Sequence, residues 1–443
     1  MGDLTSVIVW YLSNNTLSNN ISQRRVNNWL KMHSLRLQYS RLNLYRNTFS
    51  LLEKYVKPSI ASCCSNFSTE LPSFNESDQF KAAVLHPKKQ NLTVETLVLP
   101  DTAADGMVRV GVDYCAVNGI DVKCIYQDIN TVTLPFIPGS EFSGEILEVG
   151  PNCKRQFQIG DKVAVLGLKH VGGGLSHQCF VPETECIHVD PRLSQKDAAT
   201  IIQGYSNSLL AFTKYAPIKE GDDVVIFAGP GGDGLAAIDI AHNILKANVY
   251  VVFASASIDA LVRDESAHKA INCNVGLTKV YNYFKNTLAS KQFKAVFDTY
   301  DSKILHVIAD FISPNGYILT EDPFFSPETF EAPYFKKDTG KKSKKKKPTL
   351  EEIEEPENID WTERVKKVDI TKYQTTEPEF YEQIVNQAFE LHATEKINPF
   401  VSQVWNLREV NKAIQFVNLK KCLGKVLIDT RRKKASLEGK QIA

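Results

Sequence analysis

The sequence predicts an α/β protein in which a β-rich segment precedes a doubly wound parallel sheet. Residues 224–228 form an apolar run that ends in a cluster of glycines, and a helix-like segment, 235–245, follows directly. A second apolar run at 248–254 supplies the next parallel strand. Helical and strand patterns alternate after Ala198, whereas residues 81–200 carry short strand patterns separated by glycines and polar turns. This order predicts two domains, one rich in β-strands and one in which helices and strands alternate.

The glycine cluster is the most informative local pattern. Gly229, Gly231 and Gly234 form a G-x-G-x-x-G motif between a strand and a helix, and Gly232 lies within it. The first glycine permits a tight turn, the second lets a pyrophosphate approach the backbone, and the third lets helix and strand pack closely. The N–H groups at the start of the helix would then hold the phosphates. Outside such a context the same glycines would indicate only a loop.

Length and composition limit the class of protein. The 443 residues suffice for two domains and additional segments, and a net charge of +1 predicts no general attraction to nucleic acid or to membranes. No apolar run approaches the ~20 residues of a membrane-spanning helix. The nine cysteines form no C-x-x-C pair and lack the spacing of a structural zinc site, which indicates reduced thiols inside a cell.

The first 52 residues have a composition of their own. They contain one acidic residue, Asp3, and six basic residues, as mitochondrial presequences do. Their helical amphipathicity is mediocre, because Arg46 falls on the apolar face. We expect mitochondrial import. A disordered extension, or a true start at Met32, is the alternative, and either would leave the protein in the cytoplasm.

Three strands are expected at residues 81–85, 92–99 and 106–117. A lysine run at 336–347 followed by glutamates at 351–357 predicts a solvated loop, with a nuclear signal or a polyanion contact as the alternative. We expect regular structure to resume at Phe380, with a helix at 381–391, and to end near Asp429.

Six segments in order resemble the medium-chain dehydrogenase/reductase superfamily, specifically its zinc-independent quinone oxidoreductase-like branch. The similarity spans about residues 81–431, apart from the charged insert. The segments are Val117-Asn118-Gly119-Ile120-Asp121; Pro138-Gly139-Ser140-Glu141-Phe142-Ser143-Gly144; Val149-Gly150 with Gly160-Asp161-Lys162-Val163; Gly231-Gly232-Asp233-Gly234-Leu235-Ala236-Ala237; Ile397-Asn398-Pro399 with the stretch from Leu407 to Ala413; and Gly424-Lys425-Val426.

The resemblance implies a GroES-like, β-rich catalytic domain into which a Rossmann domain is inserted. Coenzyme and substrate would lie between them, and a homodimer is implied. The expected divisions are an N-terminal extension at 1–78, the first part of the catalytic domain at 79–204, the Rossmann domain at 205–396 with a disordered charged insert at about 335–367, a return to the catalytic domain at 397–431, and a tail at 432–443.

The resemblance also bears on zinc. Zinc-dependent relatives have Cys at the position of Asn118 and His at that of Ser140, and an amide and a hydroxyl are poor zinc ligands. Without this Lewis acid, alcohol dehydrogenation is disfavoured. We therefore expect no metal. Reduction of a quinone or a conjugated enone needs only hydride from a nicotinamide.

Three residues are the candidates for contacts around the nicotinamide. Asn118 is expected to bind the coenzyme or the substrate oxygen, Tyr126 to donate a proton to the reduced oxygen, and Asn207 to lie beside the nicotinamide. The alternatives are that Asn118 caps a turn, that Tyr126 belongs to the core and that Asn207 begins a helix. We expect Glu141 to be structural, binding nearby backbone donors.

The end of the second parallel strand bears on the choice of coenzyme. Ser255 and Ser257 follow that strand, and no acidic residue occurs before Asp259. Because an acidic residue there would select the ribose 2′-OH of NAD(H), the sequence favours NADP(H). The family's lysine a few residues on is replaced by Ile258 or Asp259, so the preference is modest.

Departures from the family pattern surround the expected coenzyme site. Asp233 stands where an apolar residue is usual, and a carboxylate near a pyrophosphate repels it unless it points to solvent. The sequence predicts a zinc-independent reductase that transfers hydride from NADPH to a quinone or enone. The alternative is a catalytically degenerate relative that senses nucleotides or binds a partner.

Overall fold

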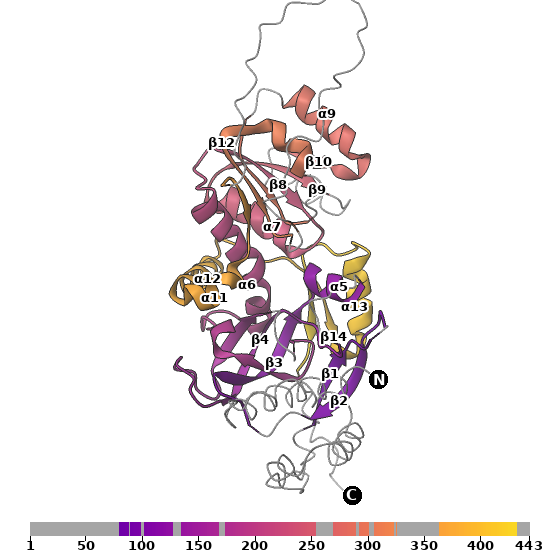
Figure 1. Ribbon diagram of the computed structural model, residues 1–443, viewed down its shortest axis with the longest axis vertical. Coiled ribbons are helices and arrows are strands. Elements are labelled where there is room, and N and C mark those ends of the chain that lie inside the picture. Colours follow the sequence, from indigo (N-terminus) through magenta and orange to yellow (C-terminus); the bar gives the residue numbers. More distant parts are fainter. Residues whose placement is uncertain are drawn as a thin grey trace, which may run out of the picture.

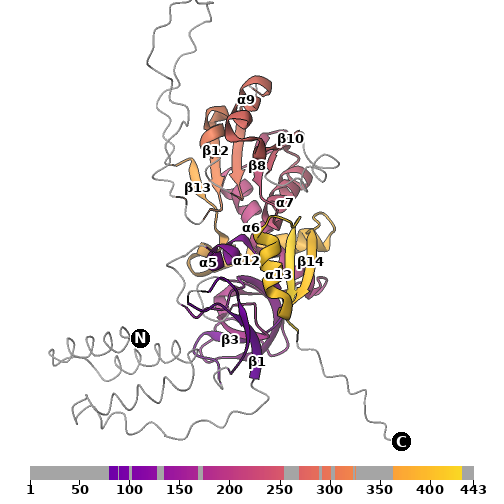
Figure 2. The same ribbon diagram turned by 90° about the vertical axis from the view of Figure 1, so that its right-hand side faces the viewer.

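The computed structural model describes residues 79–87, 89–98, 102–126, 134–167, 173–253, 269–288, 292–300, 305–322, 325 and 363–431. Two lobes are stacked along the longest axis, one built on an antiparallel β-sheet and the other on a parallel sheet (Figure 1). Two elements from late in the chain, β14 (Val401–Asn406) and α13 (Val410–Asn418), lie beside the first strands (Figure 2). The chain therefore leaves the β-rich lobe, builds the other lobe and returns.

The β-rich lobe contains a seven-stranded, mostly antiparallel sheet in the order β14-β15-β3-β4-β5-β7, with β6 paired to β3. A separate hairpin pairs β1 with β2. From Met107 to Val112 in β3, alternate residues are buried, as expected for a strand with one face in the core. The strands are β1 (Gln79–Val84), β2 (Thr93–Val98), β3 (Met107–Ala116), β4 (Glu141–Val149), β5 (Lys162–Leu166), β6 (Gln178–Pro182), β7 (Cys186–His188), β14 (Val401–Asn406) and β15 (Lys425–Asp429).

The second lobe is built on a six-stranded parallel sheet in the order β10-β9-β8-β11-β12-β13. Val224 and Ile226 pack in one hydrophobic cluster with α6, α7 and α12, whereas Val225 and Phe227 pack in another with α9 and α10. Helices thus cover both faces of the sheet, which explains its continuous apolar runs. The strands are β8 (Asp223–Ala228), β9 (Asn248–Phe253), β10 (Lys269–Asn272), β11 (Phe293–Asp298), β12 (Ile312–Thr320) and β13 (Val365–Lys367).

Helix α6 lies between the two lobes and contacts strands of the antiparallel sheet as well as α7. It begins at the N-cap Ser194, whose hydroxyl accepts a hydrogen bond from the Asp197 N–H. The helices are α5 (Gly119–Tyr126), α6 (Gln195–Leu209), α7 (Gly232–Asp239), α9 (Leu277–Thr287), α10 (Leu305–Ile308), α11 (Tyr373–Thr376), α12 (Pro378–Ala393) and α13 (Val410–Asn418); π-helical turns extend α6 at Leu210–Tyr215 and α7 at Ile240–Ile244.

The fold class predicted from the sequence is confirmed, with differences in detail. The strands expected at 81–85, 92–99 and 106–117 are β1, β2 and β3 within two residues at each end. The expectation that regular structure resumes only at Phe380 is wrong, because β13, a 3₁₀ turn at Ile370–Lys372 and α11 precede it. The charged insert was expected to extend to about residue 367, but Val365–Lys367 pairs with β12 and extends the buried sheet.

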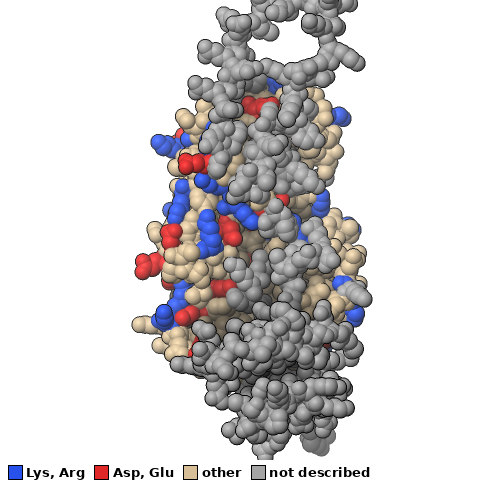
Figure 3. Space-filling model, viewed as in Figure 1, with Lys and Arg blue, Asp and Glu red and all other residues tan. Residues whose placement is uncertain are grey.

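Several expectations concern residues outside the described ranges. These are the N-terminal extension 1–78, most of the charged insert, Ser255, Ser257 and the tail 432–443. Among the described residues, no helix is both long enough and apolar enough to cross a membrane. On the face shown in Figure 3, basic and acidic side chains of the described residues lie next to one another, in keeping with the net charge of +1.

Candidate coenzyme-binding site and the adjoining polar cluster

The glycine turn between β8 and α7 leaves an accessible helix N-terminus. Gly231 is the N-cap residue of α7, with φ −75° and ψ −178°, and no side chain accepts a hydrogen bond there. A Cβ on Gly231 would meet no heavy atom within 4 Å, so the space beside its backbone is open. Unpaired N–H groups and the positive end of the helix dipole favour an anion at such a position. The turn therefore has the shape and polarity that a diphosphate requires.

The other glycines of the turn are closely packed. A Cβ on Gly234 would lie 2.7 Å from Ala228 Cα, and one on Gly229 would lie 2.6 Å from Tyr300 Cδ2. A Cβ on Gly232 would lie 2.6 Å from Lys425 Cγ. These three glycines are thus needed for contacts with β8, with the residues after β11 and with β15. Their predicted contacts with a coenzyme remain predictions.

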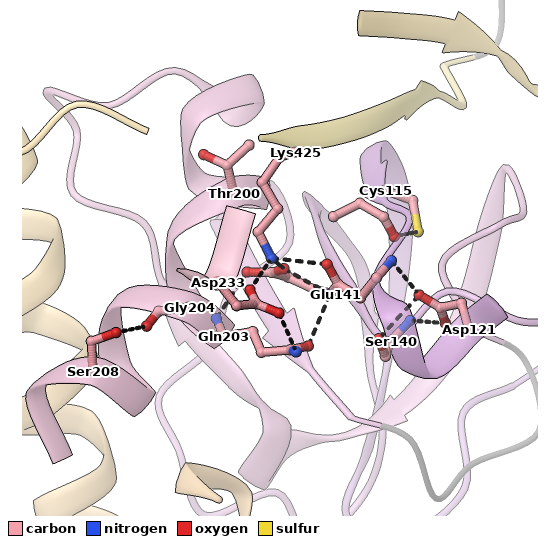
Figure 4. Close-up of polar contacts among 12 residues, drawn as sticks. Cys115, Asp121, Ser140, Glu141, Thr200, Gln203, Gly204, Ser208, Asp233 and Lys425 are labelled. Atoms are coloured by element: carbon pink, nitrogen blue, oxygen red, sulfur yellow. Dashed lines mark hydrogen bonds and ion pairs between the residues drawn. The ribbon is translucent and has the colours of Figure 1, made fainter. Parts of the chain in front are cut away.

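A buried polar cluster, which we call the interlobe cluster, adjoins this turn and consists of Asn118, Glu141, Gln203, Asp233 and Lys425. The Lys425 ammonium donates hydrogen bonds to Asn118 Oδ1 (2.8 Å), Glu141 Oε2 (2.9 Å) and Asp233 Oδ1 (2.8 Å). Figure 4 shows Lys425 reaching down between the carboxylates of Asp233 and Glu141. Asp233 belongs to the parallel-sheet lobe, and Lys425 and Glu141 to the β-rich lobe. The cluster therefore joins the two lobes.

The amides of Asn118 and Gln203 complete the cluster. Asn118 Nδ2 donates to Glu141 Oε2 and to Gln203 Oε1, each across 2.9 Å. Gln203 Nε2 donates to Asp233 Oδ2 across 3.2 Å, and the Gln203 backbone N–H donates to Glu141 Oε1. Both oxygens of each carboxylate thus have a partner, as buried charges require.

The local backbone explains how Lys425 reaches this position. Gly424 has φ +85°, and its N–H donates to the carbonyl of Pro230 in the glycine turn. The Lys425 N–H donates to the Phe400 carbonyl, which holds the start of β15 beside β14. The side chain of Lys425 then lies across Gly232. Both glycines are needed. Gly424 permits the positive φ before the lysine, and Gly232 leaves room for the aliphatic part of the Lys425 side chain.

Charge interactions determine the protonation of this region. Burial alone would lower the pKa of Lys425, but the adjacent Asp233 and Glu141 carboxylates raise it above its usual value, so the ammonium is charged. Burial and the charge of Asp233 raise the pKa of Glu321, which follows β12, well above the usual range, while an Asn207 hydrogen bond and Lys425 oppose the shift. One oxygen of Glu321 has no hydrogen-bond partner among the described residues. The region therefore holds more carboxyl groups than cations.

The predicted site residues have different surroundings. Both amide hydrogens of Asn118 are used within the interlobe cluster. Asn207 lies inside α6, not at its start, and its Oδ1 accepts the Ile370 N–H across 2.9 Å. Tyr126 ends α5 and packs, half-buried, against the core of the β-rich lobe. The structure thus brings Asn118 to the lobe boundary near the glycine turn. The catalytic roles of Asn118 and Tyr126, and the contact of Asn207 with the nicotinamide, stay predictions.

The positions that correspond to zinc ligands are tied to Asp121. This carboxylate accepts the backbone N–H groups of Asn118, Gly139 and Ser140, and burial nevertheless raises its pKa to about 6. In the described part of the chain, no three His, Cys, Asp or Glu side chains are grouped so that they could hold a metal ion.

Sequence reasoning did not identify two residues of the interlobe cluster. Lys425 was noted only as part of the Gly424-Lys425-Val426 segment, and Gln203 was not singled out. Asp233 was expected to repel a phosphate unless it pointed to solvent; its side chain is 18% exposed and forms an ion pair with Lys425, a partner that the sequence analysis did not consider. The signal that could have indicated the pair is an acidic residue in the glycine turn together with a lysine in another family segment.

Comparisons with known proteins agree with this architecture. Residues 104–191 match the family described as "Alcohol dehydrogenase GroES-like domain". A "Quinone oxidoreductase-like protein 2 homolog" of Nematostella vectensis is 25% identical over 365 residues, which cover 80% of this chain and 90% of that protein. A Schizosaccharomyces pombe protein with the name "Probable quinone oxidoreductase" is 31% identical over 232 residues, 52% of this chain and 67% of that protein.

Solved structures share the fold. A mycobacterial structure complexed with NADPH superposes with a TM-score of 0.61 at 18% identity, covering 79% of this chain and 99% of that one. The fold and the sequence matches together define an oxidoreductase of the medium-chain dehydrogenase/reductase superfamily. Within it, the chain belongs to the quinone oxidoreductase-like branch.

Proposed function

We propose that this protein is an NADPH-dependent reductase of quinones or conjugated enones that works without zinc. The observation that carries the proposal is the open backbone at Gly231, where a helix N-terminus without a side-chain cap faces free space. This arrangement fits the diphosphate of a dinucleotide. A structural relative complexed with NADPH supports the choice of coenzyme.

Different residues around the glycine turn would bind different parts of the coenzyme. The N–H groups that begin α7 would hold the diphosphate, and the nicotinamide end would lie toward the boundary between the lobes, where Asn118 and Asn207 are found. A bound nicotinamide coenzyme supplies the hydride, so the protein's task is to orient it and the acceptor. Asn118 and Ser140, an amide and a hydroxyl, stand where zinc-dependent relatives have metal ligands.

One observation favours a second candidate, a non-catalytic protein that keeps the fold as an interaction platform. The Asp233 and Glu141 carboxylates lie close to the glycine turn, with Lys425 as the cation that the described residues place between them. Carboxylates oppose the binding of a phosphate. If the repulsion dominated, the fold would persist without coenzyme binding.

Thermal unfolding in the presence of coenzyme separates the two candidates. If NADPH binds with micromolar affinity, millimolar NADPH should stabilise the folded protein by about 4 kcal/mol. The Gly231→Ala variant should show a smaller stabilisation, because a methyl group would enter the open space. Gly119→Ala is the matched control, since a Cβ there also meets nothing within 4 Å and the residue likewise begins a helix. Absence of any shift with both NADPH and NADH would exclude the reductase.

The acceptor is then identified by turnover. Oxidation of NADPH, followed at its nicotinamide absorbance, should require an added quinone or enone and should survive dialysis against a chelator. Loss of activity on chelation, with recovery on adding zinc, would contradict the metal-free proposal.

Two further proposals concern the whole chain. We propose that it forms a homodimer, which light scattering of the purified protein tests directly. We also propose that it is imported into mitochondria, since the first 52 residues are basic and nearly free of acidic side chains. Amino-terminal sequencing of the protein isolated from cells would show whether that segment has been removed.

A further inference from the structure

The interlobe cluster places one cation between two carboxylates, and one of those carboxylates belongs to the glycine turn itself. Asp233 is the second residue of α7, directly after Gly232, and its carboxylate is held 2.8 Å from the Lys425 ammonium. Its other oxygen accepts from Gln203. Because both oxygens are engaged away from the helix N–H groups, the carboxylate does not cap α7. Asp233 therefore leaves the N–H groups of α7 available to an anion.

A carboxylate so close to the helix N-terminus still acts on a bound anion through its charge. Opposite charges within a few ångströms cancel much of each other's field, whereas a bare carboxylate in a partly buried position is poorly screened. Among the described residues, Lys425 is the partner that forms an ion pair with Asp233. Lys425 is 4% exposed, so water cannot take over its role without reorganising the cluster.

We propose that Lys425 is a positioning residue for coenzyme binding: it neutralises Asp233 and holds that carboxylate away from the N-terminus of α7, which keeps the glycine turn able to accept a diphosphate. The inference rests on the proposed function and adds to it a residue that is 192 positions away from Asp233 in the sequence. Lys425 itself acts through Asp233 rather than by touching the coenzyme.

The proposal also accounts for the glycine at position 232. A side chain there would displace the aliphatic stem of Lys425, since a Cβ would lie 2.6–2.8 Å from its Cγ, Cδ and Cε atoms. Two distant chain segments thus meet at one point: the glycine turn, which carries the Asp233 carboxylate, and Gly424-Lys425 at the start of β15. An acidic residue in this turn is compatible with phosphate only while that lysine is in place.

The inference is tested with four proteins that differ in the charge of the interlobe cluster. They are the wild type, Asp233→Asn, Lys425→Gln and the double variant. Relative to the wild type, Lys425→Gln adds one net negative charge to the cluster, Asp233→Asn removes one, and the double variant leaves the net charge unchanged. The dissociation constant of NADPH is measured by calorimetry at two salt concentrations. Glu220→Gln and Lys421→Met, both exposed, are the matched controls for loss of an acid and of a lysine.

We expect Lys425→Gln to weaken NADPH binding about tenfold and Asp233→Asn to strengthen it a few-fold, with both differences shrinking at high salt. The double variant should return to within about threefold of the wild type, and Lys425→Arg should retain most of the affinity. A folded Lys425→Gln protein with unchanged affinity would overturn the inference. So would a double variant as weak as Lys425→Gln, because that result is expected if the lysine matters only for packing.

If Lys425→Gln does not fold, Asp233→Asn decides alone. Tighter, more salt-sensitive binding supports the inference, and unchanged or weaker binding overturns it. A wild-type protein that binds neither NADPH nor NADH would instead overturn the proposed function, on which the inference rests. Coenzyme binding by the wild type therefore distinguishes failure of the proposed function from failure of the inference about Lys425.

Discussion

Gly234 lies against Ala228 so closely that a Cβ on residue 234 would stand 2.7 Å from both the Cα and the Cβ of the alanine. This contact joins the first turn of α7 to the end of β8. Since backbone atoms are involved, the structure cannot accommodate a methyl group by turning a side chain.

Gly234→Ala should therefore destabilise the folded protein. Overpacking in a closely packed contact costs about 1–3 kcal/mol, and the gain in helix propensity offsets only part of it. Gly231→Ala, which meets open space, should change the free energy of unfolding by less than about 1 kcal/mol. Urea denaturation of the three proteins measures both values. Equal stability of the two variants would contradict the prediction.

Asn118→Ala should lower stability by about 2–3 kcal/mol, because it removes hydrogen bonds to Glu141, Gln203 and Lys425 and leaves buried polar atoms without partners. Chemical denaturation is the measurement, and Asn418→Ala, at an exposed position, is the control. A stable Asn118→Ala protein with impaired turnover would instead indicate a residue whose main contacts are with the coenzyme or the substrate.

The contact between His392 on α12 and Asp197 on α6 should make stability depend on pH. The Asp197 carboxylate, 3.8 Å from the imidazole, raises the pKa of His392 above its usual value, and the nearby imidazole lowers the pKa of Asp197 below its usual value. Because the pKa of His392 is raised on folding, its contribution to the free energy of unfolding is fully present below pH 6.5. That contribution is lost as the pH rises through the pKa of His392 in the folded protein. Because the pKa of Asp197 is lowered on folding, its contribution is present above pH 3.8 and is lost as the pH falls through the pKa of Asp197 in the folded protein.

His392→Gln should consequently cost about 0.5 kcal/mol near pH 5.5 and almost nothing near pH 9, a small value because the pair is partly exposed. Thermal unfolding at the two pH values tests this. His242→Gln is a control, since His242 forms no ion pair with a carboxylate of the described chain. A loss of stability that is the same at both pH values would exclude the ion pair as its cause.

The fold could be predicted because its main signals are local. The apolar run of β8, the glycines after it and the start of α7 are contiguous, so one short stretch specifies strand, turn and helix. The return of the chain to the β-rich lobe was inferred from the resemblance alone. β13 was missed because three residues, Val365–Lys367, carry too little pattern to stand out beside a charged segment.

The interlobe cluster could not be predicted from local pattern. Lys425 is 192 residues from Asp233 and 284 from Glu141, and no periodicity relates the three. The sequence analysis of Asp233 considered only the glycine turn in which it occurs, where a carboxylate either repels a phosphate or points to solvent. The alternative that Asn207 begins a helix is wrong, since Asn207 lies inside α6, and its partner, the Ile370 N–H, is 163 residues away in the sequence. Buried polar contacts between distant segments depend on the assembled fold.

The return of β15 to the edge of β3 has a consequence for biosynthesis. A ribosome releases β3 and β4 long before Lys425, because Glu141 and Lys425 are separated by 284 residues. At about 5–20 residues per second, β15 is synthesised on the order of tens of seconds after β3 and β4, so the nascent sheet lacks this strand during that time. Throughout that interval the Glu141 carboxylate has no lysine, and the exposed flank of β3 is a place where chaperones could act.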